Sequence, residues 1–153
     1  CIALEVLRGD QTEGRSVILW LFLVVWATDI GGYVFGQWIG GAKLAPSISP
    51  GKTWAGLIGG AASAAVVAAI LLAATSVERS IMAIVALSAL VAVVSQAGDL
   101  FESWYKRRFG VKDSGQLIPG HGGVLDRIDG MLLAAPLAAI VFWLSQGGIA
   151  LWK

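Results

Sequence analysis

Residues 54–77 read WAGLIGGAASAAVVAAILLAATSV and contain no charged side chain. About 20 consecutive apolar residues are enough for an α-helix to cross the hydrocarbon core of a bilayer. In lipid, every backbone N–H and C=O group needs a partner within the protein, and a single segment achieves this only as a helix. The stretch therefore predicts a transmembrane helix in an integral membrane protein.

Four stretches of the chain have the length and apolar character of a membrane span: 16–39, 54–77, 80–105 and 130–152. The third is uncharged up to Asp99, and we expect this helix to continue past the membrane surface. The first is apolar except for Asp29, and an ionisable side chain at such a depth is a functional candidate. Residues 1–15 carry several charges and are interpreted as an extramembrane connection. The prediction is an all-α, polytopic helical bundle that forms a single domain over residues 1–153.

The overall composition supports this interpretation. Hydrophobic residues make up 57% of the chain and charged residues 14%, whereas soluble domains usually contain about a quarter of charged residues. The net charge of +1 does not indicate nucleic-acid binding, so any affinity for phosphate must come from local clusters. The only cysteine, Cys1, excludes an internal disulfide and a cysteine-rich zinc site.

The distribution of basic residues predicts the orientation in the membrane. Four spans place the two polar connections, 40–53 and 106–125, on the same side. This side carries most of the basic residues: Lys43, Lys52, Lys106, Arg107, Arg108, Lys112 and Arg127. The other side carries fewer: Arg8, Arg15, Arg79 and Lys153. The positive-inside rule makes the richer side cytoplasmic.

Small residues at helical spacing predict close packing between the first two spans. The first span has glycine at positions 32, 36 and 40, and the second has Gly56, Gly60, Ala64 and Ala68. In lipid, such small side chains allow two helix backbones to approach closely.

Carboxylates gather where the third and fourth spans meet the polar connection. Four polar side chains of the third span share one helix face at spacings i, i+3, i+4 and i+7: Asp99, Glu102, Ser103 and Lys106. Two carboxylates share a face at the start of the fourth span: Asp126 and Asp129. Because Mg²⁺ binds carboxylates together with substrate phosphates, this set suits phosphoryl or nucleotidyl transfer. The alternative is that the aspartates only form ion pairs with nearby basic residues: Lys106, Arg107 and Arg127.

The polar connections contain groups that bind phosphate. Residues 49–53, SPGKT, precede a predicted helix N-terminus, where free N–H groups favour an anion. They match only the tail of a P-loop, so a helix cap with an interfacial anchor is the alternative. Residues 106–108 and Lys112 favour anionic lipid head groups. His121, between glycines, is a candidate general acid or hydrogen-bond donor to a phosphate.

Taken together, these motifs resemble the signature of the phosphatidate cytidylyltransferase family. The segments that carry the resemblance are SWYKR at 103–107, KDSG at 112–115, PGHGG at 119–123 and DRID at 126–129. Upstream, the matching positions are Asp29, Tyr33, Gly36, Lys43 and the segment SPGKTW at 49–54. Two positions depart from the family pattern, Ala55 in place of glutamate and Tyr105 in place of an aliphatic residue. Because family members are longer, the chain is expected to be their C-terminal, motif-bearing part.

The resemblance implies that CTP and phosphatidate react to give CDP-diacylglycerol and pyrophosphate in phospholipid biosynthesis, with Mg²⁺ as cofactor and a second cation as a further expectation. It implies three metal-binding carboxylates, Asp99, Asp126 and Asp129, and adds Lys106 and His121 as catalytic residues. The expected substrate-binding residues are Asp29, Ser49, Lys52, Thr53, Ser103, Arg107, Lys112, Asp113 and Arg127.

The expected location is the cell (inner) membrane, which the chain crosses several times with its active-site loops on the cytoplasmic side. The expected partners are CTP, phosphatidate and the bilayer, with no nucleic acid, and a homodimer is a further expectation. Three alternatives stay open. The first is a related CTP-dependent membrane enzyme, either a CDP-archaeol synthase or a polyprenol kinase. The others are an ion-coupled transporter with Asp29 as its ion site and an inactive scaffold.

Overall fold

The structure is a computed structural model that describes residues 2–8, 14–74, 81–111 and 129–146. The elements of these residues are α1 (Ile2–Arg8), α2 (Gly14–Trp38), β1 (Lys43–Ala45), β2 (Ser49–Thr53), α3 (Trp54–Ala74), α4 (Ile81–Arg108) and α5 (Met131–Gln146). Three helices, α2, α3 and α4, are long and apolar enough to cross a membrane, and α5 is a shorter apolar helix. The predicted all-α, polytopic membrane fold is therefore confirmed. The fourth predicted span, 130–152, is helical up to Gln146, and its remainder lies outside the described residues.

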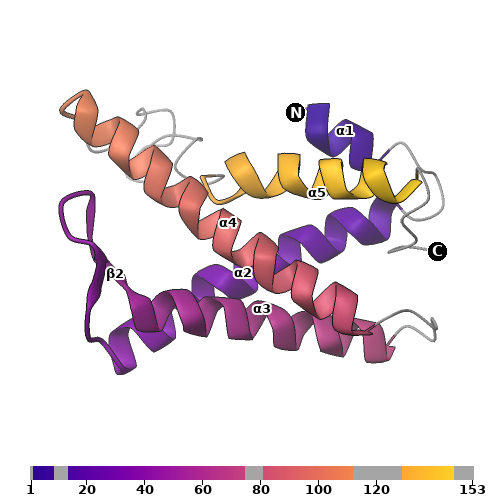
Figure 1. Cartoon of the computed structure of the whole chain (residues 1–153), viewed down its shortest axis with the longest axis horizontal. Coiled ribbons are helices and arrows are strands. Elements are labelled where there is room, and N and C mark those ends of the chain that lie inside the picture. Colours follow the sequence, from indigo (N-terminus) through magenta and orange to yellow (C-terminus); the bar gives the residue numbers. More distant parts are fainter. Residues whose placement is uncertain (1, 9–13, 75–80, 112–128, 147–153) are drawn as a thin grey trace, which may run out of the picture.

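The helices form a bundle in which α3 lies along α2 and α4 crosses over both (Figure 1). Helix α5 packs on α4, and the short helix α1 lies against α5 and α2. The apolar core contains Leu21 and Val24 of α2, Val91 of α4 and Ala134 of α5, all fully buried. The small strands β1 and β2 lie together at one end of the bundle, near the C-terminal part of α4.

Glycines set the distance between α2 and α3. A Cβ atom added to Gly56 would lie 2.7 Å from the carbonyl oxygen of Gly32, and one added to Gly60 would lie 2.8 Å from that of Thr28. Both distances are shorter than a Cβ atom tolerates, and both involve backbone that cannot rotate away. The predicted close packing of these two spans is thus present, with glycine required at both positions of α3.

Two of the buried hydroxyl groups in the bundle, those of Thr28 and Ser88, find acceptors within their own helices. Thr28 Oγ1 donates to the carbonyl oxygen of Val24 at 2.8 Å, and Ser88 Oγ donates to that of Ile84 at 2.8 Å. Ser88 Oγ also accepts a hydrogen bond of 3.0 Å from Trp20 Nε1, which joins α2 to α4. An unpaired polar group in lipid would cost several kcal/mol, so these contacts make polar side chains compatible with a membrane helix.

The connection between α2 and α3 is a β-hairpin. Strands β1 and β2 are antiparallel, with Lys43 opposite Thr53 and Ala45 opposite Ser49. Helix α2 ends at Trp38 and is followed by Gly40 and Gly41. Their φ angles of 61° and 87° lie in the left-handed region that glycine adopts without strain. The sequence predicted a polar connection here, without the strands.

The N-terminal segment differs from its prediction as a connection. Within residues 1–15, Ile2–Arg8 form helix α1, and helix α2 begins at Gly14 instead of residue 16. Leu7 is completely buried in the core, so α1 is part of the bundle. The charged residues of the segment made its few apolar residues easy to overlook in the sequence. A helix of this length needs only a few apolar residues to bury one face.

Helix α4 begins at Ile81 and ends at Arg108, three residues beyond the predicted end of the third span at residue 105. The N–H groups of Gly110 and Val111 donate to the carbonyl oxygens of Arg107 and Lys106 at 3.2 and 3.0 Å. Together with a φ of 67° at Gly110, this is the Schellman arrangement that stops a helix.

Aromatic side chains surround the hairpin end of the bundle. Trp38 ends α2, Trp54 begins α3, and Trp104 and Tyr105 lie near the end of α4, and all four are exposed. Tryptophan and tyrosine favour the membrane–water interface because each has an apolar ring and a polar group. Exposed aromatic side chains at the hairpin end are therefore compatible with a position of this end near the membrane surface.

We predict that Gly56→Ala destabilises the bundle by about 1–3 kcal/mol, because the new methyl group meets the carbonyl oxygen of Gly32 and forces α2 and α3 apart. The measurement is thermal or detergent-induced unfolding of the purified protein, followed by circular dichroism. Gly51→Ala is the matched control, since nothing lies within 4 Å of a Cβ atom there. Equal stability of the two variants would contradict a glycine-dependent contact.

Candidate active site

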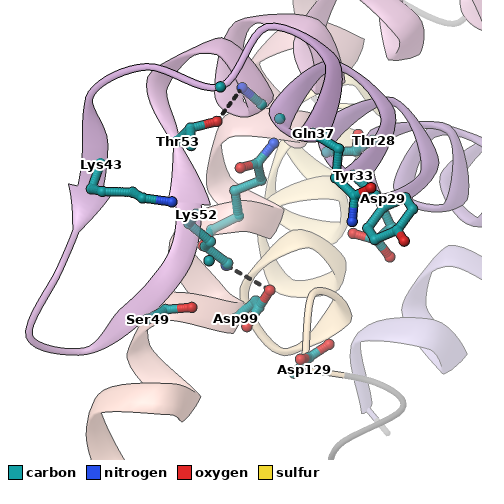
Figure 2. A pocket seen from close by; sticks show the side chains of 16 residues that line it. Thr28, Asp29, Tyr33, Gln37, Lys43, Ser49, Lys52, Thr53, Asp99 and Asp129 are labelled. Atoms are coloured by element: carbon teal, nitrogen blue, oxygen red, sulfur yellow. Dashed lines mark hydrogen bonds and ion pairs between the residues drawn. The ribbon is translucent and has the colours of Figure 1, made fainter.

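A cavity of about 690 Å³, lined mainly by residues with polar side chains and by glycines, lies at the hairpin end, among α2, the hairpin, the start of α3, α4 and the turn before α5. Five ionisable side chains that bear on phosphate or metal chemistry line it: Asp29, Lys43, Lys52, Asp99 and Asp129. Figure 2 shows the lysines reaching in from the hairpin, with Asp99 and Asp129 on the opposite side. The cavity thus brings together charges from four parts of the chain that are far apart in sequence.

The hairpin is held against the start of α3 by the side chain of Thr53. Thr53 is 3% exposed, and its Oγ1 accepts a hydrogen bond of 3.1 Å from the N–H of Gly56. This is the N-cap arrangement, which satisfies a free N–H in the first turn of a helix. A Cβ atom on Gly36 would lie 3.3 Å from the same oxygen, so glycine at this position lets α2 pass close to the cap. The predicted helix cap in residues 49–53 is therefore present at Thr53.

Lys52, next to the cap, crosses the cavity to α4. Its ammonium group forms an ion pair of 2.5 Å with Asp99 and donates to the carbonyl oxygen of Gln96 at 3.4 Å (Figure 2). The two side chains are 19% and 32% exposed, so solvent screens the pair only partly. Lys52 therefore links the hairpin to α4 and places a positive charge among the carboxylates of the cavity.

Asp129 lies beside Asp99 because α4 has a glycine at the contact. A Cβ atom on Gly98 would lie 3.0 Å from the carbonyl oxygen of Asp129. Burial raises the pKa of Asp129, and the neighbouring charge of Asp99 raises it further. The hydrogen bond of 2.6 Å from the N–H of Gly130 and the charges of Lys52 and Lys106 act in the opposite direction. The net effect is a raised pKa, so this pair of carboxylates favours an added positive charge.

The acidic stripe of α4 divides into two parts. Ser103 Oγ donates to Asp99 at 3.4 Å, so it supports the carboxylate in the cavity. Glu102 is 3% exposed and forms an ion pair of 3.0 Å with Lys106, one turn further along the helix. Asp99 thus pairs with Lys52, a partner that was not among the basic residues considered for it from the sequence.

Six of the predicted site residues line the cavity: Asp29, Ser49, Lys52, Thr53, Asp99 and Asp129. Three others belong to α4 and do not line it: Ser103, Lys106 and Arg107. The remaining five lie outside the described residues: Lys112, Asp113, His121, Asp126 and Arg127.

Sequence reasoning missed several polar side chains of the cavity. Thr28, Gln37 and Gln96 line it, and Tyr33 and Lys43 entered the prediction only through the family resemblance. Gln96 precedes Asp99 by three residues and therefore shares its helix face, which is the signal that could have identified it. The Nε2 atom of Gln96 is buried, and a Cβ atom added to Gly60 would lie only 2.6 Å from it. The glycine seam of α2 and α3 therefore also makes room for this amide.

The carboxylates of the cavity suit a hard divalent cation that is completed by substrate oxygens. Mg²⁺ is usually held by one or two carboxylates, water and phosphate oxygens, and Asp99 and Asp129 provide two such groups. Within the described ranges, no group of three His, Cys, Asp or Glu side chains is gathered closely enough to hold a metal. Asp126, the third predicted ligand, lies outside these ranges. The ammonium group of Lys52 against Asp99 shows that this position accepts a cation.

We predict that Asp129→Asn makes the metal-free protein more stable at neutral pH. A carboxyl group whose folded pKa is raised contributes stability that is complete below its unfolded value of 3.8 and is lost as the pH rises through the folded value. The asparagine keeps an oxygen for the N–H of Gly130 and does not titrate. Unfolding temperatures measured in EDTA from pH 4 to 7 should fall more steeply for the wild type than for the variant. Parallel curves would show that Asp129 has no raised pKa.

Comparison with known proteins identifies the family. Residues 1–145 match the Cytidylyltransferase family. A protein named phosphatidate cytidylyltransferase from Brucella suis is 54% identical over 136 residues, which are 89% of this chain and 50% of the relative. The proteins of the same name from Haemophilus influenzae and Staphylococcus haemolyticus are each 44% identical, over 93% and 87% of this chain and 51% of each relative. The chain spans about half the length of these relatives. Since the match covers nearly the whole sequence, the chain belongs to the Cytidylyltransferase family.

Proposed function

We propose that the protein transfers the cytidylyl group of CTP to phosphatidate, which gives CDP-diacylglycerol and pyrophosphate. The observation that carries the proposal is the cavity at the hairpin end of the bundle, in which lysines and carboxylates face each other. Lysines suit the phosphates of a nucleotide, and carboxylates suit the cation that accompanies them. The names of the relatives support the same reaction.

The reaction joins two phosphate groups and needs little covalent help from the protein. The phosphate monoester of phosphatidate is anionic near neutral pH, and one of its oxygens attacks the α-phosphorus of CTP. The bond between the α-phosphorus and the oxygen that bridges to the β-phosphate breaks, and pyrophosphate leaves with that oxygen. No side chain has to remove a proton from this nucleophile. The protein must align the two anions and offset their repulsion, so positioning and electrostatics provide most of the rate enhancement.

Asp99 and Asp129 would hold Mg²⁺, with Asp126 as a predicted third ligand. When bound, the cation neutralises phosphate charge and polarises the phosphorus centre. Ser103 keeps the carboxylate of Asp99 oriented through its hydrogen bond. Lys106 offsets the buried charge of Glu102, which is a supporting role outside the cavity.

The hairpin would bind the nucleotide phosphates. Lys43, Ser49 and Lys52 all line the cavity from the hairpin, and the N-terminus of α3 lies beside them. A helix N-terminus and two ammonium groups are complementary to a polyphosphate. Arg107 and the predicted residues beyond Val111, which are Lys112, Asp113, His121 and Arg127, would add contacts to the phosphates or the departing pyrophosphate.

Helix α2 would admit the lipid. Tyr33 lines the cavity and is 66% exposed, and Ile30 and Trp26 continue an exposed apolar stripe along the same helix. Acyl chains can lie along this stripe while the phosphate of the lipid enters beside Asp29. We propose that this end faces the cytoplasm at the inner membrane, which the excess of basic residues near the cavity supports through the positive-inside rule. A second cation and a homodimer stay predictions.

The first test is product formation from CTP and phosphatidate by the intact protein in liposomes. We expect Mg²⁺-dependent CDP-diacylglycerol, and a loss of at least about a hundredfold in rate for Asp99→Asn, since a bound metal contributes several kcal/mol to such transition states. Glu5→Gln is the matched control, because it changes the same type of group on an exposed position of α1. Full activity of Asp99→Asn would remove Asp99 from the site.

The position of the label in CTP separates this reaction from its alternatives. Cytidylyl transfer moves an α-phosphorus label into the lipid, whereas a polyprenol kinase moves a γ-phosphorus label. Archaeal ether lipid offered in place of phosphatidate tests the CDP-archaeol synthase reaction. Ion flux in liposomes without any nucleotide dependence would favour a transporter.

A further inference from the structure

Lys52 occupies a position that a metal ion in this cavity would need. Its ammonium group contacts an Asp99 oxygen at 2.5 Å, while Asp29 and Asp129 lie in the same cavity. Mg²⁺ binds oxygen at about 2.0–2.1 Å and demands near-octahedral geometry. A carboxylate oxygen in a short contact with an ammonium group presents its lone pair to that group, and two cations on one carboxylate repel each other.

The backbone of Lys52 is fixed, but its side chain is not. The adjacent Thr53 caps α3 and is buried, and Lys43 pairs with Thr53 across the hairpin. The second contact of the ammonium group, to the carbonyl oxygen of Gln96, is long at 3.4 Å. Displacement of the ammonium group therefore requires its ion pair with Asp99 to break and a flexible side chain to rotate, without movement of the backbone.

We infer that Lys52 is the resident counter-cation of Asp99 and competes with the divalent ion, so that the cation binds tightly only when a phosphate group draws Lys52 away. This inference rests on the proposed function, because it describes how the same cavity takes up its metal and its nucleotide. Without nucleotide, the ion pair keeps the carboxylate neutralised and the metal affinity low. With nucleotide, the ammonium group moves to the phosphates, and the freed oxygen of Asp99 accepts the metal.

The hairpin supplies a matched comparison for this idea. Lys43 also lines the cavity and carries the same charge, but among the described residues it forms no ion pair with a carboxylate. Removal of either lysine makes the cavity more negative by the same amount. Only the removal of Lys52 also frees Asp99. A general electrostatic effect predicts similar changes for both lysines, whereas direct competition predicts a change specific to Lys52.

The test is Mn²⁺ binding to the intact protein in detergent without nucleotide or lipid, measured by electron paramagnetic resonance of the free ion. We expect Lys52→Met to bind Mn²⁺ roughly fivefold or more tightly than the wild type, which is the lower range of coupling between two sites. Lys43→Met should change the affinity clearly less, and Lys52→Arg should remain as weak as the wild type. An affinity of Lys52→Met that is equal to or weaker than that of the wild type would overturn the inference.

A second measurement uses the wild type alone. Amine acylation followed by mass spectrometry should label Lys52 more rapidly when Mn²⁺ is present, because its ammonium group has left Asp99, while labelling of Lys43 stays constant. Unchanged labelling of Lys52 at saturating Mn²⁺ would contradict the competition. Neither experiment measures product. CDP-diacylglycerol formation with no change in these readouts would overturn only the role of Lys52, whereas absence of product would count against the proposed function itself.

Discussion

The close contact between α2 and α3 is the constraint on which the rest of the structure depends. Where Gly56 faces the carbonyl oxygen of Gly32, the two backbones approach to a distance that no side chain allows. This contact places the cap at Thr53 beside α2 and fixes the hairpin, so that Lys52 reaches across to α4. Asp29 of α2 and Lys52 of the hairpin therefore line the same cavity. Packing in lipid depends on such van der Waals contacts because water provides no driving force between helices.

The membrane helices could be predicted from sequence because their signal is strong and local. The span predicted over residues 54–77 corresponds to α3, which ends three residues earlier, at Ala74. The span predicted over residues 80–105 corresponds to α4, whose first part is uncharged. The hairpin was not predicted, since strands of only three and five residues, KLA and SPGKT, show no alternation of polar and apolar side chains. Helix α1 was interpreted as a connection because its charges conceal the buried side chain of Leu7.

The candidate site was predictable in part. The sequence indicated Asp99 and Asp129, and the fold places both in one cavity. It could not indicate how far the cavity extends along α4. Lys106 follows Asp99 by seven residues, which is about 10 Å along a helix, and it therefore lies beyond the cavity and pairs with Glu102. Gln96 was missed because an amide carries no charge, and the partnership of Lys52 with Asp99 depends on tertiary structure that no local spacing encodes.

The exposed aromatic side chains at the hairpin end have a consequence for the way in which a lipid would reach the cavity. If Trp38, Trp54 and Trp104 lie at the membrane surface, as exposed tryptophans tend to, the cavity is at the level of the phosphates of the surrounding lipids. Transfer of an acyl chain from the bilayer into water costs about 0.8 kcal/mol for each CH₂ group. A lipid that reaches the cavity by lateral diffusion avoids this desorption penalty, because only its head group leaves the lipid layer. The rate of substrate supply would then depend on the surface density of the lipid in the membrane rather than on its concentration in water.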